Sequence, residues 1–304
     1  YGSLEEIAAI DGVKAVAMET QYEPAVAERH GGVDPNAYPS SGMIGSGQLW
    51  NSGYTGAGSR IAIIDTGLDT DHQNFAPLGE DVAVTATADT VAAVLSELNA
   101  AYRYEGLTTG DVYYNTKVAY GFNYVDNNLN ITHDYDDRGD HGTHVAGIAA
   151  ANKVDASGVV GVAPNAQLYV MKVFGANGGA YTEDILAALE DALLLGADVI
   201  NLSLGSDNGW ADDDTASNRA YDRLNEAGIT FMISAGNSGD STAGNNYGEH
   251  TLTADPETAM MSAPAVYANG LAVASMENSV AAQSFLTWTD AQGSENKAYF
   301  ADPN

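Results

Sequence analysis

Strand-like and helix-like segments alternate through the second half of this sequence, and that pattern leaves few folds open. Short apolar strands are predicted at residues 167–173, 198–203, 229–234 and 270–274, with helices at 182–195 and 215–227 between them. Each helical pattern ends at a glycine and has acidic residues at its start, as helix caps and the helix dipole favour. Strands joined by helical crossovers run parallel, with helices covering the sheet. The sequence therefore predicts an α/β fold built on a mainly parallel sheet.

A further buried strand is predicted upstream, where four consecutive apolar residues, 61–64, lead to Asp65. Such a run is typical of a strand covered on both faces. Ligands of open α/β sheets bind beyond the carboxyl ends of the strands, and Asp65 stands at such an end. Taken alone, Asp65 could equally be an ordinary strand-terminating residue. One more strand is predicted at 118–125, and an amphipathic helix at 90–101 within an insertion of about 77–116.

The segment Gly139-Asp140-His141-Gly142-Thr143-His144-Val145-Ala146-Gly147 leads into an alanine-rich run and predicts a helix packed closely on the sheet. Asp140 is placed to cap the first turn, so that His141 begins the helix. The positive end of the helix dipole disfavours an imidazolium there and leaves His141 as a neutral base. We expect Gly142 to leave room for a substrate backbone beside His141, and Gly147 to allow close packing.

Taken alone, this motif leaves two alternatives open. It could be a capped surface helix, or His141 and His144 could hold a metal, since residues three apart share a helix face. A metallohydrolase would use Asp140, His141 and His144.

Composition excludes several classes of protein. A net charge of -30 over 304 residues argues against binding to nucleic acid or to anionic membranes. Without cysteine there is no disulfide, thiolate nucleophile or thiolate metal site. No run approaches 18 apolar residues, so no membrane span is predicted. Because the sequence begins at Tyr1 with no signal peptide, we expect a processed or excised piece.

Three further turns follow predicted strands and meet at the same end of the sheet. Gly205 closes the segment 201–205 and would let an extended peptide lie alongside the backbone. The Gly-rich segment 174–180 forms a second such edge. Asn237 supplies an uncharged N–H₂ donor of the kind that stabilises an oxyanion. With Asp65 and His141 these segments would combine an orienting carboxylate, a base, an oxyanion donor and peptide-binding edges.

Four segments in this order resemble the successive signatures of subtilisin-like serine proteases (subtilases): Asp65-Thr66-Gly67, His141 to Gly147, Ser203-Leu204-Gly205 and Ser234-Ala235-Gly236-Asn237. The resemblance runs from about Met43 to Met276. It implies a three-layer subtilisin-like fold with helices on both faces of a mainly parallel sheet. It also implies that Asp65 holds His141, that His141 is general base and then acid, and that Asn237 is the oxyanion donor.

The same resemblance implies that a peptide substrate pairs with two strand edges, at Ser203, Leu204 and Gly205 and at Gly178, Gly179 and Ala180, with Ala235 and Gly236 beside them. His144 matches the family motif but not its catalytic position, so we interpret it as structural.

More specifically, the lead-in at 45–58, the insertion before His141 and Pro264-Ala265 resemble the cell-envelope proteinases of Gram-positive bacteria, the lactocepin-like branch. This implies a secreted or cell-wall-associated protein that cleaves protein or peptide substrates. Residues 1–24 resemble the end of a propeptide, with a linker at 25–42. The N-terminal part of a catalytic domain is expected at 43–280, and 281–304 would begin a connection to a further segment, such as a protease-associated domain.

The sequence departs from the family at the nucleophile. No Gly-Thr-Ser-Met-Ala segment occurs, and Thr258 to Pro264 only echoes it, with Met260 at the serine position. We therefore expect the sequence to stop before the catalytic Ser helix. The nucleophile would lie on a C-terminal segment that is either missing from this sequence or a separate fragment acting as partner, and this chain alone would be inactive. The alternative is a non-catalytic peptide-binding or adhesive relic of a subtilase, although such a relic has no need of Asp65, His141 and Asn237 together.

No cofactor is expected for the chemistry, but a structural calcium ion is one interpretation of the loop after residue 125. Asp126, Asn128 and Asn130 place oxygen ligands at alternate positions, as at the start of a calcium loop. Ile131 stands where such a loop needs a glycine for its sharp turn. A solvated acidic loop without metal is the alternative.

Overall fold

A computed structural model describes residues 21–24, 44–132, 139–154, 159–175, 179–206, 216–237, 261–275, 285–289 and 295–299, and the single residues Ile7, Ala9, Val13 and Val16. Two compact units are distinguished, one formed by Tyr1–Val26 with Tyr54–Ala274 and the other by Ala27–Gly53 with Ser275–Asn304. The segment 1–24, which resembles the end of a propeptide, lies mostly outside the described residues.

Six parallel strands form the central sheet of the first unit, in the order β3-β4-β2-β6-β8-β9. Their bounds are β2 (Arg60–Asp65), β3 (Val118–Asn123), β4 (Gln167–Lys172), β6 (Val199–Leu202), β8 (Thr230–Ser234) and β9 (Leu271–Val273). Every residue of β3 and β4 is buried, which explains why apolar and polar residues do not alternate along these strands. The predicted parallel α/β fold is confirmed.

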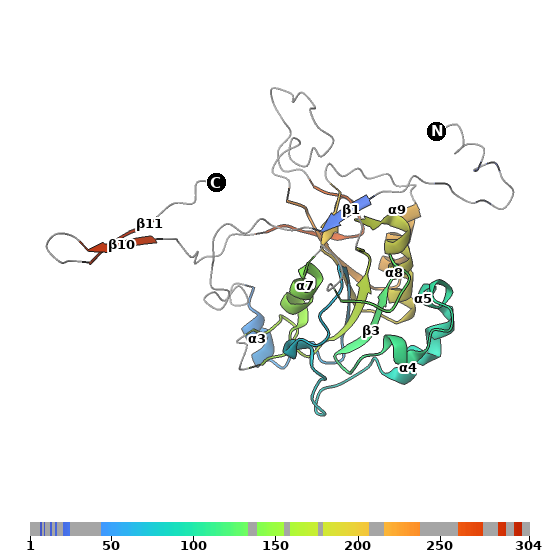
Figure 1. Ribbon diagram of the computed structural model, residues 1–304, viewed down its shortest axis with the longest axis horizontal. Helices are drawn as coiled ribbons and strands as arrows, with labels where there is room; N and C mark the ends of the chain where they lie inside the picture. Colours follow the sequence, from blue (N-terminus) through green and yellow to red (C-terminus); the bar gives the residue numbers. More distant parts are fainter. Residues whose placement is uncertain are drawn as a thin grey trace, which may run out of the picture. The chain divides into compact units, whose positions relative to one another are not determined.

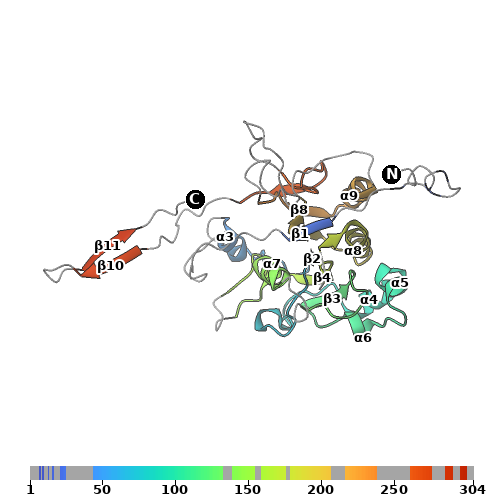
Figure 2. The same cartoon turned by 45° about the horizontal axis from the view of Figure 1, so that its top comes forward.

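Helices cover the two faces of this sheet (Figures 1 and 2). Ile63 of β2 packs in one hydrophobic cluster with Ala146 and Ala150 of α7 (His141–Ala150). Its neighbours Ala62 and Ile64 belong to the other cluster, which includes residues of α8 (Thr182–Leu194) and α9 (Ala216–Glu226). Because successive side chains of a strand point to opposite faces, α7 lies on one face and α8 and α9 on the other.

The ends of α8 agree with the sequence prediction except at the N-terminal cap. α8 carries Glu183 and Asp184 in its first turn and is followed by Gly196, whose φ of 73° is the left-handed conformation that glycine adopts readily. Thr182 does not cap this helix as predicted. It is the first helical residue, and Tyr181 at the cap position makes no side-chain capping bond.

The insertion after β2 differs from the prediction. Instead of one helix at 90–101, it contains α4 (Ala88–Val94), the 3-10 turn η3 (Leu95–Glu97), α5 (Asn99–Arg103) and α6 (Thr109–Val112). The chain becomes extended at Leu98. There the buried carboxylate of Asp191, from α8, accepts hydrogen bonds from the backbone N–H groups of Asn99 (2.6 Å) and Ala100 (3.1 Å). A residue 92 positions away therefore caps a new helix where local periodicity predicts a continuous one.

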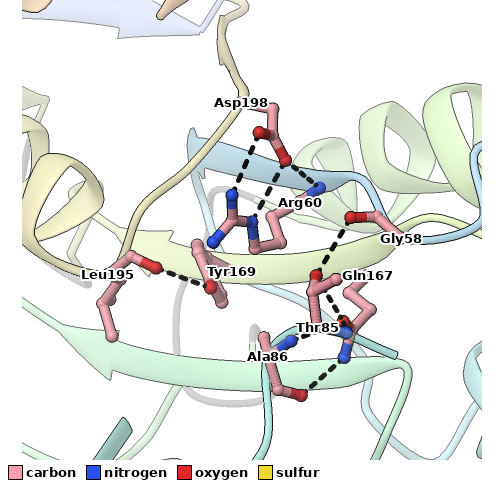
Figure 3. A network of polar contacts seen from close by, with 8 residues as sticks. All are labelled: Gly58, Arg60, Thr85, Ala86, Gln167, Tyr169, Leu195 and Asp198. Atoms are coloured by element: carbon pink, nitrogen blue, oxygen red, sulfur yellow. Dashed lines mark hydrogen bonds and ion pairs between the residues drawn. The ribbon is translucent and has the colours of Figure 1, made fainter. Parts of the chain in front are cut away.

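Polar contacts join the amino ends of the strands (Figure 3). Arg60, at the start of β2, binds both carboxylate oxygens of Asp198, just before β6, at 3.1 and 3.0 Å. The side-chain amide of Gln167, at the start of β4, accepts from the backbone of Thr85 and Ala86 and donates to the Ala86 carbonyl oxygen. These contacts tie the amino end of the sheet to the insertion. The carboxyl end of the sheet is therefore the end available for a functional site.

Three short strands form a separate antiparallel sheet in the order β5-β1-β7. They are β1 (Gln21–Pro24), β5 (Ala180–Tyr181) and β7 (Leu204–Gly205). The second unit contains α3 (Ser46–Asn51) and a hairpin of β10 (Phe285–Thr289) and β11 (Glu295–Tyr299). No helix among the described residues is long and apolar enough to cross a membrane.

Candidate active site

Asp65 and His141 meet at the carboxyl end of the central sheet. His141 Nδ1 lies 2.7 Å from Asp65 Oδ1, although 76 residues separate the two in sequence. The Asp65 side chain is fully buried, and that of His141 is 12% exposed. A buried carboxylate in contact with Nδ1 fixes the orientation of the imidazole and leaves Nε2 for another partner. The pair can therefore act as an oriented base.

Close packing between two turns holds this pair together. A Cβ at Gly142 would lie 2.3 Å from the carbonyl oxygen of Gly67 and 3.1 Å from Asp65 Oδ1. The backbone N–H of Gly142 also donates to Thr66 Oγ1 at 2.8 Å. The predicted role of Gly142, to leave room for a substrate, is therefore wrong. Gly142 lets the start of α7 approach the Asp65-Thr66-Gly67 turn.

Two other expectations about α7 need correction. Asp140 precedes the helix without a side-chain capping bond, and instead its carbonyl oxygen accepts from the N–H of His144 at 2.9 Å. Nothing lies within 4 Å of a Cβ placed on Gly147, so this glycine does not serve close packing. Ala146 and Ala150 are the small buried residues that let α7 approach the sheet.

Asn237 lies three residues after the end of β8, at the same end of the sheet as Asp65. It ends the turn Ala235-Gly236-Asn237 and is exposed. Backbone bonds hold the turn from both sides, because Ala235 donates to Val273 and accepts from Ser262, each at 2.9 Å. Gly236 has a φ of 104° and would clash with Ser262 if it carried a Cβ. The strand-end position predicted for the oxyanion donor is thus rigidly built.

The two predicted peptide-binding edges hold an extended segment of the chain itself. β1 lies antiparallel between β5 and β7, with Tyr22 opposite Ala180 and Glu23 opposite Gly205. Of the residues predicted for these edges, Ala180, Leu204 and Gly205 pair with β1; Ser203 precedes β7 and Gly179 precedes β5, while Gly178 lies outside the described residues. Both edges therefore have main-chain groups placed for an extended peptide.

Comparison with known proteins identifies the family. The model of the subtilase family matches residues 56–300, more than half of the chain. The chain belongs to the subtilase family. It is 36% identical to the PIII-type proteinase of Lactococcus lactis subsp. cremoris (strain SK11) over 296 residues, which cover 93% of this chain and 14% of that protein.

Two more relatives are also named as a proteinase or a protease. This subtilase is 36% identical to the PII-type proteinase of Lacticaseibacillus paracasei over 293 residues, 92% of the chain and 14% of the relative. It is 32% identical to the minor extracellular protease Vpr of Bacillus subtilis (strain 168) over 247 residues, 78% of the chain and 25% of the relative. The predicted family, and its lactocepin-like branch, are confirmed. The chain spans 14% of the length of the PIII-type proteinase of Lactococcus lactis.

The contacts give the metal hypotheses little support. The described residues contain no group of three or more His, Cys, Asp or Glu side chains that could hold a metal. Asp140, His141 and His144 are among the described residues and do not form such a group. In the predicted calcium loop, the oxygens of Asp126, Asn128 and Asn130 surround an amide nitrogen of the protein, that of Asn123. Calcium at this loop stays a prediction, and these contacts favour the metal-free alternative.

Lys172 is a residue of this subtilase's site that the motifs did not point to. It ends β4 opposite Asp65 in β2, is 2% exposed, and donates a hydrogen bond from Nζ to the carbonyl oxygen of Thr66. It thereby fixes the turn that follows Asp65. A sequence signal was available, because Lys172 is the one charged residue in the strand predicted at 167–173.

Replacing Lys172 by methionine should lower the stability of the chain. Methionine keeps the apolar stem but leaves the Thr66 carbonyl without this donor, which costs about 1–3 kcal/mol of unfolding free energy. Urea unfolding followed by circular dichroism measures the loss. Lys153→Met is the matched control, since Lys153 is exposed. Equal stabilities of the two variants would contradict the role given to Lys172.

Proposed function

We propose that this chain supplies the aspartate, histidine and oxyanion-stabilising asparagine of a serine endopeptidase, and that the nucleophilic serine comes from a segment outside this sequence. The observation that carries the proposal is the buried Asp65 carboxylate 2.7 Å from His141 Nδ1, at the end of the sheet where two strand edges pair with an extended chain. Membership of the subtilase family supports the chemistry.

The proposed mechanism uses Asp65 only to orient and stabilise His141. With Nδ1–H held by Asp65, Nε2 takes the proton of the serine hydroxyl as its oxygen attacks the scissile carbonyl carbon. The carbonyl oxygen becomes an oxyanion, to which the Asn237 side chain donates a hydrogen bond. His141 then gives its proton to the leaving amine as the C–N bond breaks. Water hydrolyses the acyl-enzyme by the same steps, with His141 again the base.

The surface beside α7 supports the proposal that another segment completes the fold. Ile63, Asn201, Met232 and Leu271 are paired in register across β2, β6, β8 and β9, so they share one face of the sheet. Ile63 is 1% exposed beneath α7, whereas Met232 is 36% exposed and Leu271 is 56% exposed. Apolar side chains left open on a sheet face mark an interaction surface. A segment that covered Met232 and Leu271 would also lie beside α7, the helix that begins at His141.

We further propose that residues 1–24 are the end of a propeptide and that the protein acts outside the cell. The antiparallel pairing of β1 with β5 and β7 supports the first point. The end of a propeptide would leave the active site as an extended strand between these two edges. The relation to the minor extracellular protease Vpr of Bacillus subtilis (strain 168) supports the second. The substrates would be proteins or peptides.

A fluorophosphonate probe, which labels activated serines, tests the division of the active site. The isolated chain should neither bind the probe at a serine nor cleave a fluorogenic peptide. Co-expression with the segment that carries the serine should give both labelling of that segment and cleavage, because only the complex contains all the catalytic groups.

The same segment with its serine replaced by alanine is the control, and it should restore neither reaction. Activity of the isolated chain would refute the two-part site. A stable complex that binds peptides but is not labelled would instead establish the non-catalytic relic.

A further inference from the structure

The loop that follows β3 is organised around one amide group. Asn123, the last residue of β3, is 1% exposed. Its Nδ2 atom lies 3.0 Å from Asp126 Oδ2, 3.3 Å from Asn128 Oδ1 and 3.0 Å from the carbonyl oxygen of Asn130. One nitrogen that carries two hydrogens therefore faces three oxygens. These are oxygens of the same residues from which the sequence suggests a calcium site.

Neighbouring bonds determine which way this amide points. Asn123 Oδ1 accepts a hydrogen bond from the backbone N–H of Asp126 at 3.1 Å. A flipped amide would place its oxygen against three acceptors and its nitrogen against that N–H donor, so the flipped orientation is excluded. The Asn123 backbone is also fixed, since its N–H and carbonyl oxygen each pair with Asn128 at 3.2 Å.

Two side-chain oxygens of the loop accept further hydrogen bonds. Asn128 Oδ1 accepts from the N–H of Asn130 at 2.8 Å, and Asn130 Oδ1 accepts from the N–H and the hydroxyl of Thr132 at 3.2 and 3.0 Å. Calcium binds six to eight oxygens, commonly with several carboxylates among them. Among the described residues of this loop only Asp126 supplies a carboxylate, and a hydrogen-bond donor stands where the cation would be.

We propose that the Asn123 amide takes the place of a calcium ion and makes this loop independent of metal. The loop in turn braces the active site on two sides. The carbonyl oxygen of Ile131 accepts from the N–H of Leu68, just after the Asp65 turn, and would lie 2.2 Å from a Cβ on Gly67. Asp126 Oδ1 would lie 2.9 Å from a Cβ on Gly175, which follows β4. Asn123 is thus a positioning residue, and this inference does not depend on the proposed protease activity.

Asn123→Asp, which exchanges the donor for a second carboxylate, tests the proposal. In EDTA the variant should lose at least about 5 °C in Tm, because two carboxylates and two further oxygens would then face one another without a donor. Calcium at millimolar concentration should restore part of that loss, since the exchange creates the acidic oxygen site that the natural loop lacks. A Tm in EDTA equal to that of the natural chain would overturn the proposal.

Asp126→Asn gives a second, independent test that remains decisive if Asn123→Asp fails to fold. The variant removes the charge of the single carboxylate among the oxygens that face Asn123 Nδ2. The asparagine side chain that replaces it has nearly the same shape as aspartate. Any rise in Tm that calcium causes in the natural chain should be the same in this variant, because the loop does not bind the ion. A calcium-induced rise that Asp126→Asn abolishes would show that calcium displaces the amide, and would refute the inference.

Discussion

Replacing His141 by alanine lowers kcat of the assembled protease by about 10⁶, the largest loss expected for any single residue of this chain. Without the imidazole, the serine has no base and the leaving amine has no acid, so both proton transfers are lost. The magnitude is the one known for the corresponding loss in subtilisin, a member of the same family. Steady-state hydrolysis of a fluorogenic peptide by the reconstituted complex measures it.

His144→Ala is the matched control, since His144 lies three residues further along α7 and is exposed. It should keep most of the activity, because it is His141 whose ring contacts Asp65. Equal losses in the two variants would contradict the triad and favour the metal pair that the motif alone left open. Circular dichroism of both variants excludes loss of the fold as the cause.

Replacing Asn237 by alanine lowers kcat by about 10²–10³ and changes KM little, because its hydrogen bond forms to the charge that develops in the transition state. This magnitude too is the one known for subtilisin. The same peptide assay, at several substrate concentrations, separates kcat from KM.

Asn201→Ala controls for the loss of a strand-end asparagine, since the Asn201 amide donates to Ser203 Oγ at 2.9 Å. It should cost much less than Asn237→Ala. A loss at Asn237 as large as that at His141, or one confined to KM, would contradict the role of oxyanion donor.

Most strands and helices of the first unit were predictable because local sequence carries their signals. The apolar run before Asp65 became β2, and the patterns at 182–195 and 215–227 became α8 and α9. The prediction of a single helix at 90–101 was wrong because a signal from outside the local sequence interrupts it. Its break at Leu98 depends on the carboxylate of Asp191, which belongs to a distant helix and leaves no trace in the local periodicity.

The sequence by itself determined the class of fold and the family, and it pointed to Asp65, His141 and Asn237 as candidates for the catalytic roles, because spaced motifs and strand-helix alternation are properties of local chain segments. Only the tertiary structure decided how these residues are held. It assigned Gly142 to the contact with Gly67, Lys172 to the Thr66 carbonyl, and the amide of Asn123 to the centre of a loop that the sequence suggested for calcium. Such contacts join groups far apart in sequence or depend on side-chain direction, and neither is encoded in a motif.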